Sequence, residues 1–218
     1  MADKKVQVGM FTLGMVGTNC YFVFDETVTD DEGFRHCVFF DPADRGERIF
    51  AALTDNKLRV DLILLTHGHF DHIGGADELR TLTGARLGCY NKEEAICKDP
   101  YLNLSNDYGM HLKVQPDILY DDGDLIEAAG LSMRLIATPG HTSGGCCFYF
   151  EKEKILICGD TLFEESVGRT DYPTSSTSEL IRSIKDKLFC LPEDVICYPG
   201  HGEVTTIGHE KVYNPFII

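Results

Sequence analysis

The stretch Thr66-His67-Gly68-His69-Phe70-Asp71-His72 decides the fold of this chain. It places three imidazoles and a carboxylate within six residues, directly after the apolar run 62–65. Zinc and similar ions bind these groups, so we interpret the stretch as part of a metal site and expect more than one ion. The alternative, exposed loop histidines without a role, suits a single histidine better than this cluster.

Three further candidate ligands occupy the same kind of position. Each follows an apolar run and a turn that contains glycine or proline: His141 in Thr138-Pro139-Gly140-His141, Asp160 in Cys158-Gly159-Asp160, and His201 in Pro199-Gly200-His201. Five of the eight histidines therefore fall in these motifs. We interpret the others, His36, His111 and His209, as ordinary polar or surface residues.

This order of motifs resembles the metallo-β-lactamase superfamily: His-x-His-x-Asp-His, then histidine, aspartate and histidine. The resemblance implies an α+β fold, a four-layer αβ/βα sandwich, with two divalent metal ions at one edge of its two sheets. It implies that one ion is bound by His67, His69 and His141, the second by Asp71, His72 and His201, and that Asp160 bridges both. Such a pair of ions can hold and activate a hydroxide, which makes Asp71 and Asp160 candidate catalytic residues. Zinc is the expected metal, and iron and manganese accept the same ligands.

The segments around Asp160 resemble one branch of the superfamily. Gly159-Asp160-Thr161-Leu162-Phe163 and Val167-Gly168-Arg169-Thr170-Asp171 are similar to the glyoxalase II group, and Pro199–Gly202 and Asn214-Pro215-Phe216 to its short bacterial members. The resemblance implies hydrolysis of thioesters such as S-lactoylglutathione. Longer members have a C-terminal helical domain that contacts glutathione. Only 17 residues follow His201, so we expect a single domain over residues 1–218 without that addition.

Two residues are candidates for substrate binding. Arg169 stands where the longer enzymes have a lysine that contacts glutathione, and its guanidinium could hold a carboxylate. The longer enzymes have an aromatic pair at the next two positions, where this chain has Thr170 and Asp171, and Tyr172 lies one place further on. The alternative for Arg169 is a structural ion pair with Asp171 or another acid.

Other functions stay open. Persulfide dioxygenases resemble the chain at His67, His141 and Asp160, a set that would hold a single iron. The same site could hydrolyse lactones or esters. A non-enzymatic module would bind metal without turnover. Antibiotic hydrolysis is a minor hypothesis, because secreted lactamases commonly carry cysteine or serine in place of Asp160 and have signal peptides.

The composition limits the partners and the location. The 218 residues, 43% of them hydrophobic, can bury one sizeable core, and the net charge of −15 argues against nucleic acid. A small-molecule thioester is the expected partner. No apolar run suits a membrane span, and Met1–Val8 lacks the core of a signal peptide. The nine cysteines are interpreted as buried, reduced thiols of a cytoplasmic protein, with Cys146 and Cys147 on opposite faces of a strand.

Hydrophobic periodicity predicts more strands than helices. The expected strands are 6–11, 20–24, 37–40, 60–65, 85–90, 131–138, 146–150, 155–158 and 194–198. The expected helices are 45–53, 76–82 and 176–188, the last with the capping-box pair Ser176 and Glu179. Residues 91–124 are expected to form a helix-loop insertion near the site.

Overall fold

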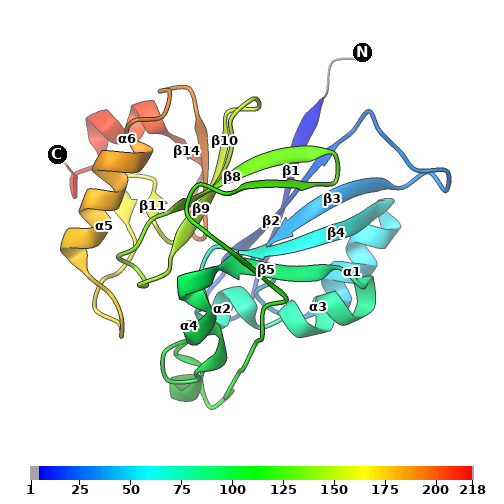
Figure 1. Ribbon diagram of the computed structural model, residues 1–218, viewed down its shortest axis with the longest axis horizontal. Coiled ribbons are helices and arrows are strands. Elements are labelled where there is room, and N and C mark those ends of the chain that lie inside the picture. Colours follow the sequence, from blue (N-terminus) through cyan, green and yellow to red (C-terminus); the bar gives the residue numbers. More distant parts are fainter. Residues whose placement is uncertain (1–4, 218) are drawn as a thin grey trace.

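Two six-stranded sheets form the middle of the computed structural model, which describes residues 5–217 (Figure 1). The first sheet has the spatial order β1 (Val6–Leu13), β2 (Thr18–Asp25), β3 (Arg35–Phe40), β4 (Leu58–Leu65), β5 (Arg86–Tyr90) and β6 (Ile118–Tyr120). The second has the order β14 (Thr205–Thr206), β13 (Ile196–Pro199), β10 (Ile155–Gly159), β9 (Cys146–Phe150), β8 (Leu131–Ala137) and β7 (Leu125–Ala128). A small hairpin joins β11 (Leu162–Phe163) and β12 (Ser166–Val167).

Helices cover the outer face of each sheet (Figure 1). Those that follow strands of the first sheet are α1 (Gly46–Asp55), α2 (Phe70–Ile73), α3 (Ala76–Thr83), the 3-10 turn η1 (Asn91–Glu93), α4 (Glu94–Lys98) and the 3-10 turn η2 (Ser105–Tyr108). Those on the second sheet are α5 (Thr177–Ser183), continued by the π-helical turn η3 (Ile184–Leu188), and α6 (Ile207–Tyr213).

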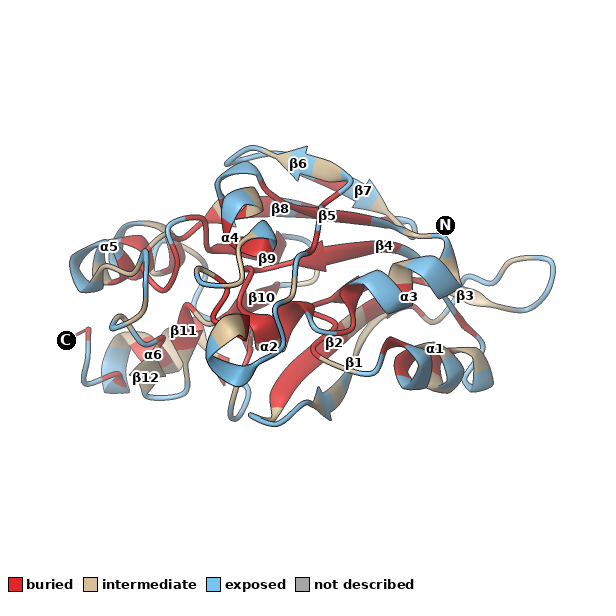
Figure 2. Cartoon of the chain, turned by 90° about the horizontal axis from the view of Figure 1, so that it is seen from below, coloured by how far each residue is buried: buried red, intermediate tan, exposed pale blue. Residues whose placement is uncertain are grey.

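Alternating side chains build three apolar cores between these layers. Along β2, Cys20 and Phe24 pack toward α1 and α3, whereas Tyr21 and Val23 face the second sheet. A third core lies beneath α5 and α6. The buried residues accordingly line the middle layers in Figure 2, and the exposed ones lie mostly on the outer helices and loops. The expected four-layer sandwich is confirmed.

The strands and long helices lie close to where periodicity predicts them. Helix α5 begins after Ser176, whose side chain accepts a hydrogen bond from the Glu179 backbone N–H at 3.4 Å. Residues 91–124 contain the expected short helices, but the prediction was wrong at Ile118–Tyr120, which pairs with β5. Strand β7 and helix α6 were not predicted.

The cysteine predictions hold for most positions. All nine cysteines are free, and eight are buried, but Cys190 is exposed. Cys146 packs between the sheets and Cys147 packs beneath α5, so the two thiols lie on opposite faces of β9 as expected. None of the helices in residues 5–217 has the length and apolarity needed to cross a bilayer. Residues 1–4 of the Met1–Val8 segment lie outside the described part.

Candidate metal centre

Strand direction explains why ligands distant in sequence meet. Strands β10 and β13 are parallel, and Gly159 pairs with Pro199, so the residues after both strands emerge at one edge. Strand β8 runs the same way, because β9 is antiparallel to both β8 and β10. The Cys146 backbone N–H donates to the Thr66 carbonyl oxygen at 2.9 Å and ties the end of β4 to this edge. Ligands from both sheets therefore converge.

The first predicted ligand set is assembled. The nitrogen atoms that His67, His69 and His141 can offer lie within 4.8 Å of one another. His69 Nδ1 lies 2.9 Å from His141 Nε2. The His141 Nδ1 atom is 2.8 Å from the Arg169 carbonyl oxygen, and a proton donated there leaves the Nε2 lone pair facing His69. These three side chains can therefore bind one ion.

The second predicted set lies beside the first. Asp71, His72 and His201 offer ligand atoms within 4.8 Å of one another, and His201 Nε2 lies 3.3 Å from Asp71 Oδ2. Asp160 stands between the two sets: its Oδ2 atom is 3.6 Å from His141 Nε2 and 3.5 Å from His201 Nε2. A carboxylate in this position can offer one oxygen to each of two ions.

Unpartnered donor atoms show that a metal fits this cluster. Among residues 5–217, four buried atoms of the cluster have no hydrogen-bond partner: His67 Nε2, His69 Nε2, His72 Nε2 and Asp160 Oδ1. Burying a polar atom without a partner costs about 1–3 kcal/mol. Clustered imidazole and carboxylate lone pairs are the donor set of zinc, iron or manganese. Bound ions would satisfy His67 Nε2, His72 Nε2 and Asp160 Oδ1, which the protein alone leaves unpaired, while His69 faces the cluster through Nδ1.

Asp41 orients the second set, and sequence reasoning missed it. Its carboxylate accepts hydrogen bonds from the Thr66 backbone N–H at 2.7 Å and from the Thr66 hydroxyl at 2.6 Å. Its Oδ2 atom also lies 3.0 Å from His72 Nδ1, which directs His72 Nε2 into the cluster. Asp41 directly follows the apolar strand β3, and this repeated arrangement was a signal that could have identified it.

Glu93 is a second missed residue and joins the loops of the first set. It is fully buried, and it accepts hydrogen bonds from the Gly68 backbone N–H at 2.8 Å and from the Thr142 hydroxyl at 2.9 Å. Gly68 lies between His67 and His69, and Thr142 follows His141. Burial raises the pKa of Glu93 to about 7. No sequence pattern links Glu93 to the loops it contacts.

The protonation of the imidazoles differs between the two sets. Burial lowers the pKa of His67 and His141 and brings that of His69 to about 3, so each of these imidazoles is neutral at neutral pH and has one nitrogen with a free lone pair. Burial also disfavours the charge on His72, but the carboxylates around it, Asp71 foremost, raise its pKa well above the usual value. Metal uptake would therefore displace a proton from His72.

The two predicted substrate residues lie at the rim of the site. Arg169, His69, Asp71, His141 and Tyr172 are among the residues that line a hollow of about 590 Å³. The Tyr172 ring lies 5.5 Å from the His69 ring, and the Arg169 guanidinium stacks 4.4 Å over Tyr172. Arg169 also makes a bidentate ion pair with Asp171, at 3.0 and 2.7 Å. The ion pair of the alternative interpretation is thus present in this structure, and the binding of a substrate carboxylate by Arg169 stays a prediction.

The three remaining histidines lie in none of the metal-binding groups found among residues 5–217. His36 contacts Asp61 and Asp30 at the surface, and His209 contacts Glu165. His111 is exposed. Their interpretation as polar or surface residues agrees with these positions.

Replacing Gly200 by alanine tests how tightly the centre is packed. The added Cβ would lie 2.2 Å from Asp160 Oδ1 and 2.8 Å from His72 Cε1. We expect metal affinity to fall by about tenfold or more, measured as metal retained after dialysis. Gly202→Ala is the control: its Cβ meets nothing within 4 Å, and its φ of +77° predicts only a stability loss of about 1 kcal/mol. Unchanged metal retention in Gly200→Ala would contradict this packing.

Comparison with known proteins shows the family. The sequence profile of the Metallo-beta-lactamase superfamily matches residues 13–201. The chain belongs to the metallo-beta-lactamase superfamily. The members of this superfamily are generally metal-dependent hydrolases that bind divalent ions, and the His/Asp cluster is compatible with such ions.

Two curated superfamily members match nearly the whole chain. The hydroxyacylglutathione hydrolase GloC of Haemophilus influenzae is 31% identical, over 91% of this chain and 92% of its own. The probable metallo-hydrolase YqgX of Bacillus subtilis is 33% identical, over 94% of each. The chain is thus similar to short hydrolases along almost their full length.

Three solved structures match the fold of this chain over almost its whole length. The B3 metallo-beta-lactamase BLEG-1 has a TM-score of 0.88 at 34% identity, covering 97% of this chain and 99% of its own. TTHA1623 in a di-iron-bound form has a TM-score of 0.79 at 30% identity, with 95% and 99% covered. ETHE1 from Myxococcus xanthus has a TM-score of 0.76 at 25% identity, with 96% and 83% covered.

Proposed function

We propose that this superfamily member is a binuclear metal-dependent hydrolase of thioesters such as S-lactoylglutathione. The observation that carries the hydrolase assignment is the position of Asp160 between two complete ligand sets, each with unpartnered buried donors. Similarity to a hydroxyacylglutathione hydrolase along nearly the whole chain supports the thioester. Free buried thiols suit a reducing compartment such as the cytoplasm.

The proposal gives each ligand set its own ion. His67, His69 and His141 would hold one divalent ion, zinc, iron or manganese, Asp71, His72 and His201 would hold the other, and Asp160 would contact both. When bound, such a pair supplies Lewis acidity and lowers the pKa of water. Thr18 donates a hydrogen bond from its hydroxyl to Asp71 Oδ2 at 2.8 Å and so fixes one carboxylate of the site.

The structural neighbours also favour specific competitors. The chain is similar to ETHE1, and we therefore retain the persulfide dioxygenase hypothesis as a second candidate. In that hypothesis His67, His141 and Asp160 would hold a single iron. The alternative metal group His67, His72 and Asp160 also contains two imidazoles and one carboxylate. BLEG-1 similarity requires that a β-lactam be included among the substrates tested. We favour the thioesterase because seven side chains that can bind metal are gathered here, whereas the single iron would need only three of them.

One preparation can separate these activities. The purified protein would be analysed for metals per chain and then assayed on S-lactoylglutathione, a lactone, a β-lactam, and glutathione persulfide with an oxygen electrode. We expect two divalent ions per chain, the highest kcat/KM on the thioester, and loss of activity on chelation. One iron per chain with oxygen consumption would replace the proposal by the dioxygenase. Metal without turnover would indicate a binding module.

A further inference from the structure

A second hollow adjoins the metal centre, and its lining includes Arg45 and Arg48 together with Asp44 and Asp71. Its volume is about 670 Å³, and it lies between the β1–β2 turn, the segment that begins α1, and Met110–Leu112. Phe70 and Asp71 line this hollow and also the hollow that contains the metal-binding residues. The two cavities therefore meet at Asp71, and a ligand over the metals can extend into the second cavity.

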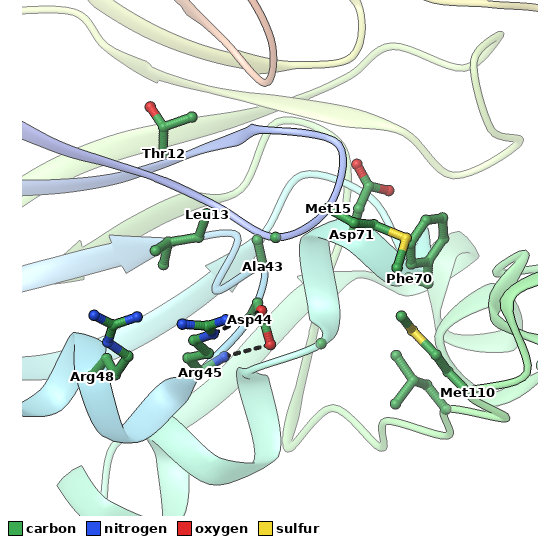
Figure 3. A pocket seen from close by; sticks show the side chains of 13 residues that line it. Thr12, Leu13, Met15, Ala43, Asp44, Arg45, Arg48, Phe70, Asp71 and Met110 are labelled. Carbon is green, nitrogen blue, oxygen red and sulfur yellow. Dashed lines mark hydrogen bonds and ion pairs between the residues drawn. The ribbon is translucent and has the colours of Figure 1, made fainter.

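The walls of this cavity change in character along its length. Met15, Phe70 and Met110 provide an apolar surface near the metal centre. Figure 3 draws Arg45 and Arg48 on the opposite side of the hollow. A ligand arm in this cavity would thus pass apolar side chains first and then reach two guanidinium groups.

The charges leave one arginine available. Arg45 is near Asp44, with 3.5 Å between Nε and Oδ2. The Asp71 carboxylate contacts His201 and accepts a hydrogen bond from Thr18, so it is not paired with either arginine. Among residues 5–217, Arg48 has no ion-pair partner and is exposed. By contrast, the Arg169 guanidinium at the rim is already paired with Asp171. In a chain of net charge −15, Arg48 is therefore a free cation beside the site.

We propose that this cavity binds the thiol arm of the substrate and that Arg48 holds a carboxylate on that arm. This inference rests on the proposed thioesterase function. The arm is assigned to the thiol because the lactoyl group has only three carbons and no charge, whereas the glutathione thiol is a tripeptide with carboxylates that can reach Arg48. A cavity of 670 Å³ accommodates a peptide-sized arm. A guanidinium binds a carboxylate through paired N–H donors.

Binding of a thioether that cannot be hydrolysed tests the proposal without relying on turnover. Titration calorimetry with S-hexylglutathione would compare the wild type, Arg48→Gln, Arg48→Glu and Arg182→Gln, all metal-loaded. Arg182 is a matched control, an exposed arginine in α5 that lines neither cavity. We expect Kd to rise about fivefold in Arg48→Gln, more in Arg48→Glu, and not at all in Arg182→Gln. Unchanged binding in both Arg48 variants, or no binding by the wild type, would overturn the proposal.

Kinetics then separate this proposal from the proposed function. Two lactoyl thioesters, one of glutathione and one of the uncharged N-acetylcysteamine, would be assayed in the same variants. We expect Arg48→Gln to raise KM for the glutathione thioester about fivefold more than for the neutral one, and added salt to reduce this difference. Equal effects on both thioesters would overturn the role of Arg48. Binding that depends on Arg48 without hydrolysis of either thioester would retain the cavity and reject the thioesterase.

Discussion

Replacing Asp160 by alanine is expected to remove bound metal and hydrolytic activity together. Asp160 Oδ1 lies 3.4 Å from His72 Nε2, and its Oδ2 lies 3.6 Å from His141 Nε2, so the carboxylate contacts both ligand sets. Without it each set would lose a negatively charged ligand, and the repulsion between two bound cations would no longer be offset by a carboxylate between them. We expect fewer than two ions per chain and a rate reduced by more than about a hundredfold, because even residues behind the ligands contribute about 10–100-fold.

The measurement pairs metal analysis with the thioester assay on one preparation. Asp171→Ala is the matched control, since Asp171 is an exposed carboxylate that pairs with Arg169 rather than with a candidate ligand. It should retain both ions. An Asp160→Ala protein that kept two ions and full activity would show that this carboxylate does not bridge the sets.

Replacing Asp41 by asparagine should weaken metal binding although Asp41 is not itself a candidate ligand. Asp41 accepts two hydrogen bonds from Thr66 and contacts His72 Nδ1 at 3.0 Å. In asparagine an NH₂ group, which is a hydrogen-bond donor, replaces one carboxylate oxygen. It would face groups that themselves donate, so a hydrogen bond would be lost. The backbone change is small, because asparagine tolerates the φ of 50° found at this position. We expect metal affinity to fall by about 10–100-fold.

Metal titration of the apo-protein measures this effect, and excess metal should restore most of the activity of Asp41→Asn. Asp61→Asn provides the control, because Asp61 forms a surface contact with His36 outside the centre. Equal metal affinities for Asp41→Asn and the wild type would contradict the orienting role. A loss of activity that excess metal did not restore would point to misfolding rather than to weakened binding.

The sequence was most informative where a local pattern had a single structural outcome. The ligands after β4, β10 and β13 could be placed because each follows an apolar strand whose end must reach a sheet edge. Helix α5 was predicted by its apolar stripe and its Ser176 cap. These features depend on neighbours within a few residues, which the sequence displays directly.

Features that depend on distant partners could not be predicted. Glu93 serves the centre only because folding brings it to Gly68, 25 residues away in the chain, and to Thr142, 49 residues away. The three-residue strand β6 is specified by pairing with β5 rather than by its own periodicity. Arg48 lies in the predicted helix 45–53, and only the fold shows that it lines a cavity that meets the metal centre at Asp71.

The central claim, two ions held by seven side chains, is tested most directly by anomalous diffraction from crystals of the metal-loaded protein. We expect two anomalous peaks about 3.5–4 Å apart. One peak would be bounded by His67, His69 and His141, the other by Asp71, His72 and His201, with Asp160 in contact with both. A single peak at full occupancy, or a second peak outside these residues, would contradict the binuclear centre.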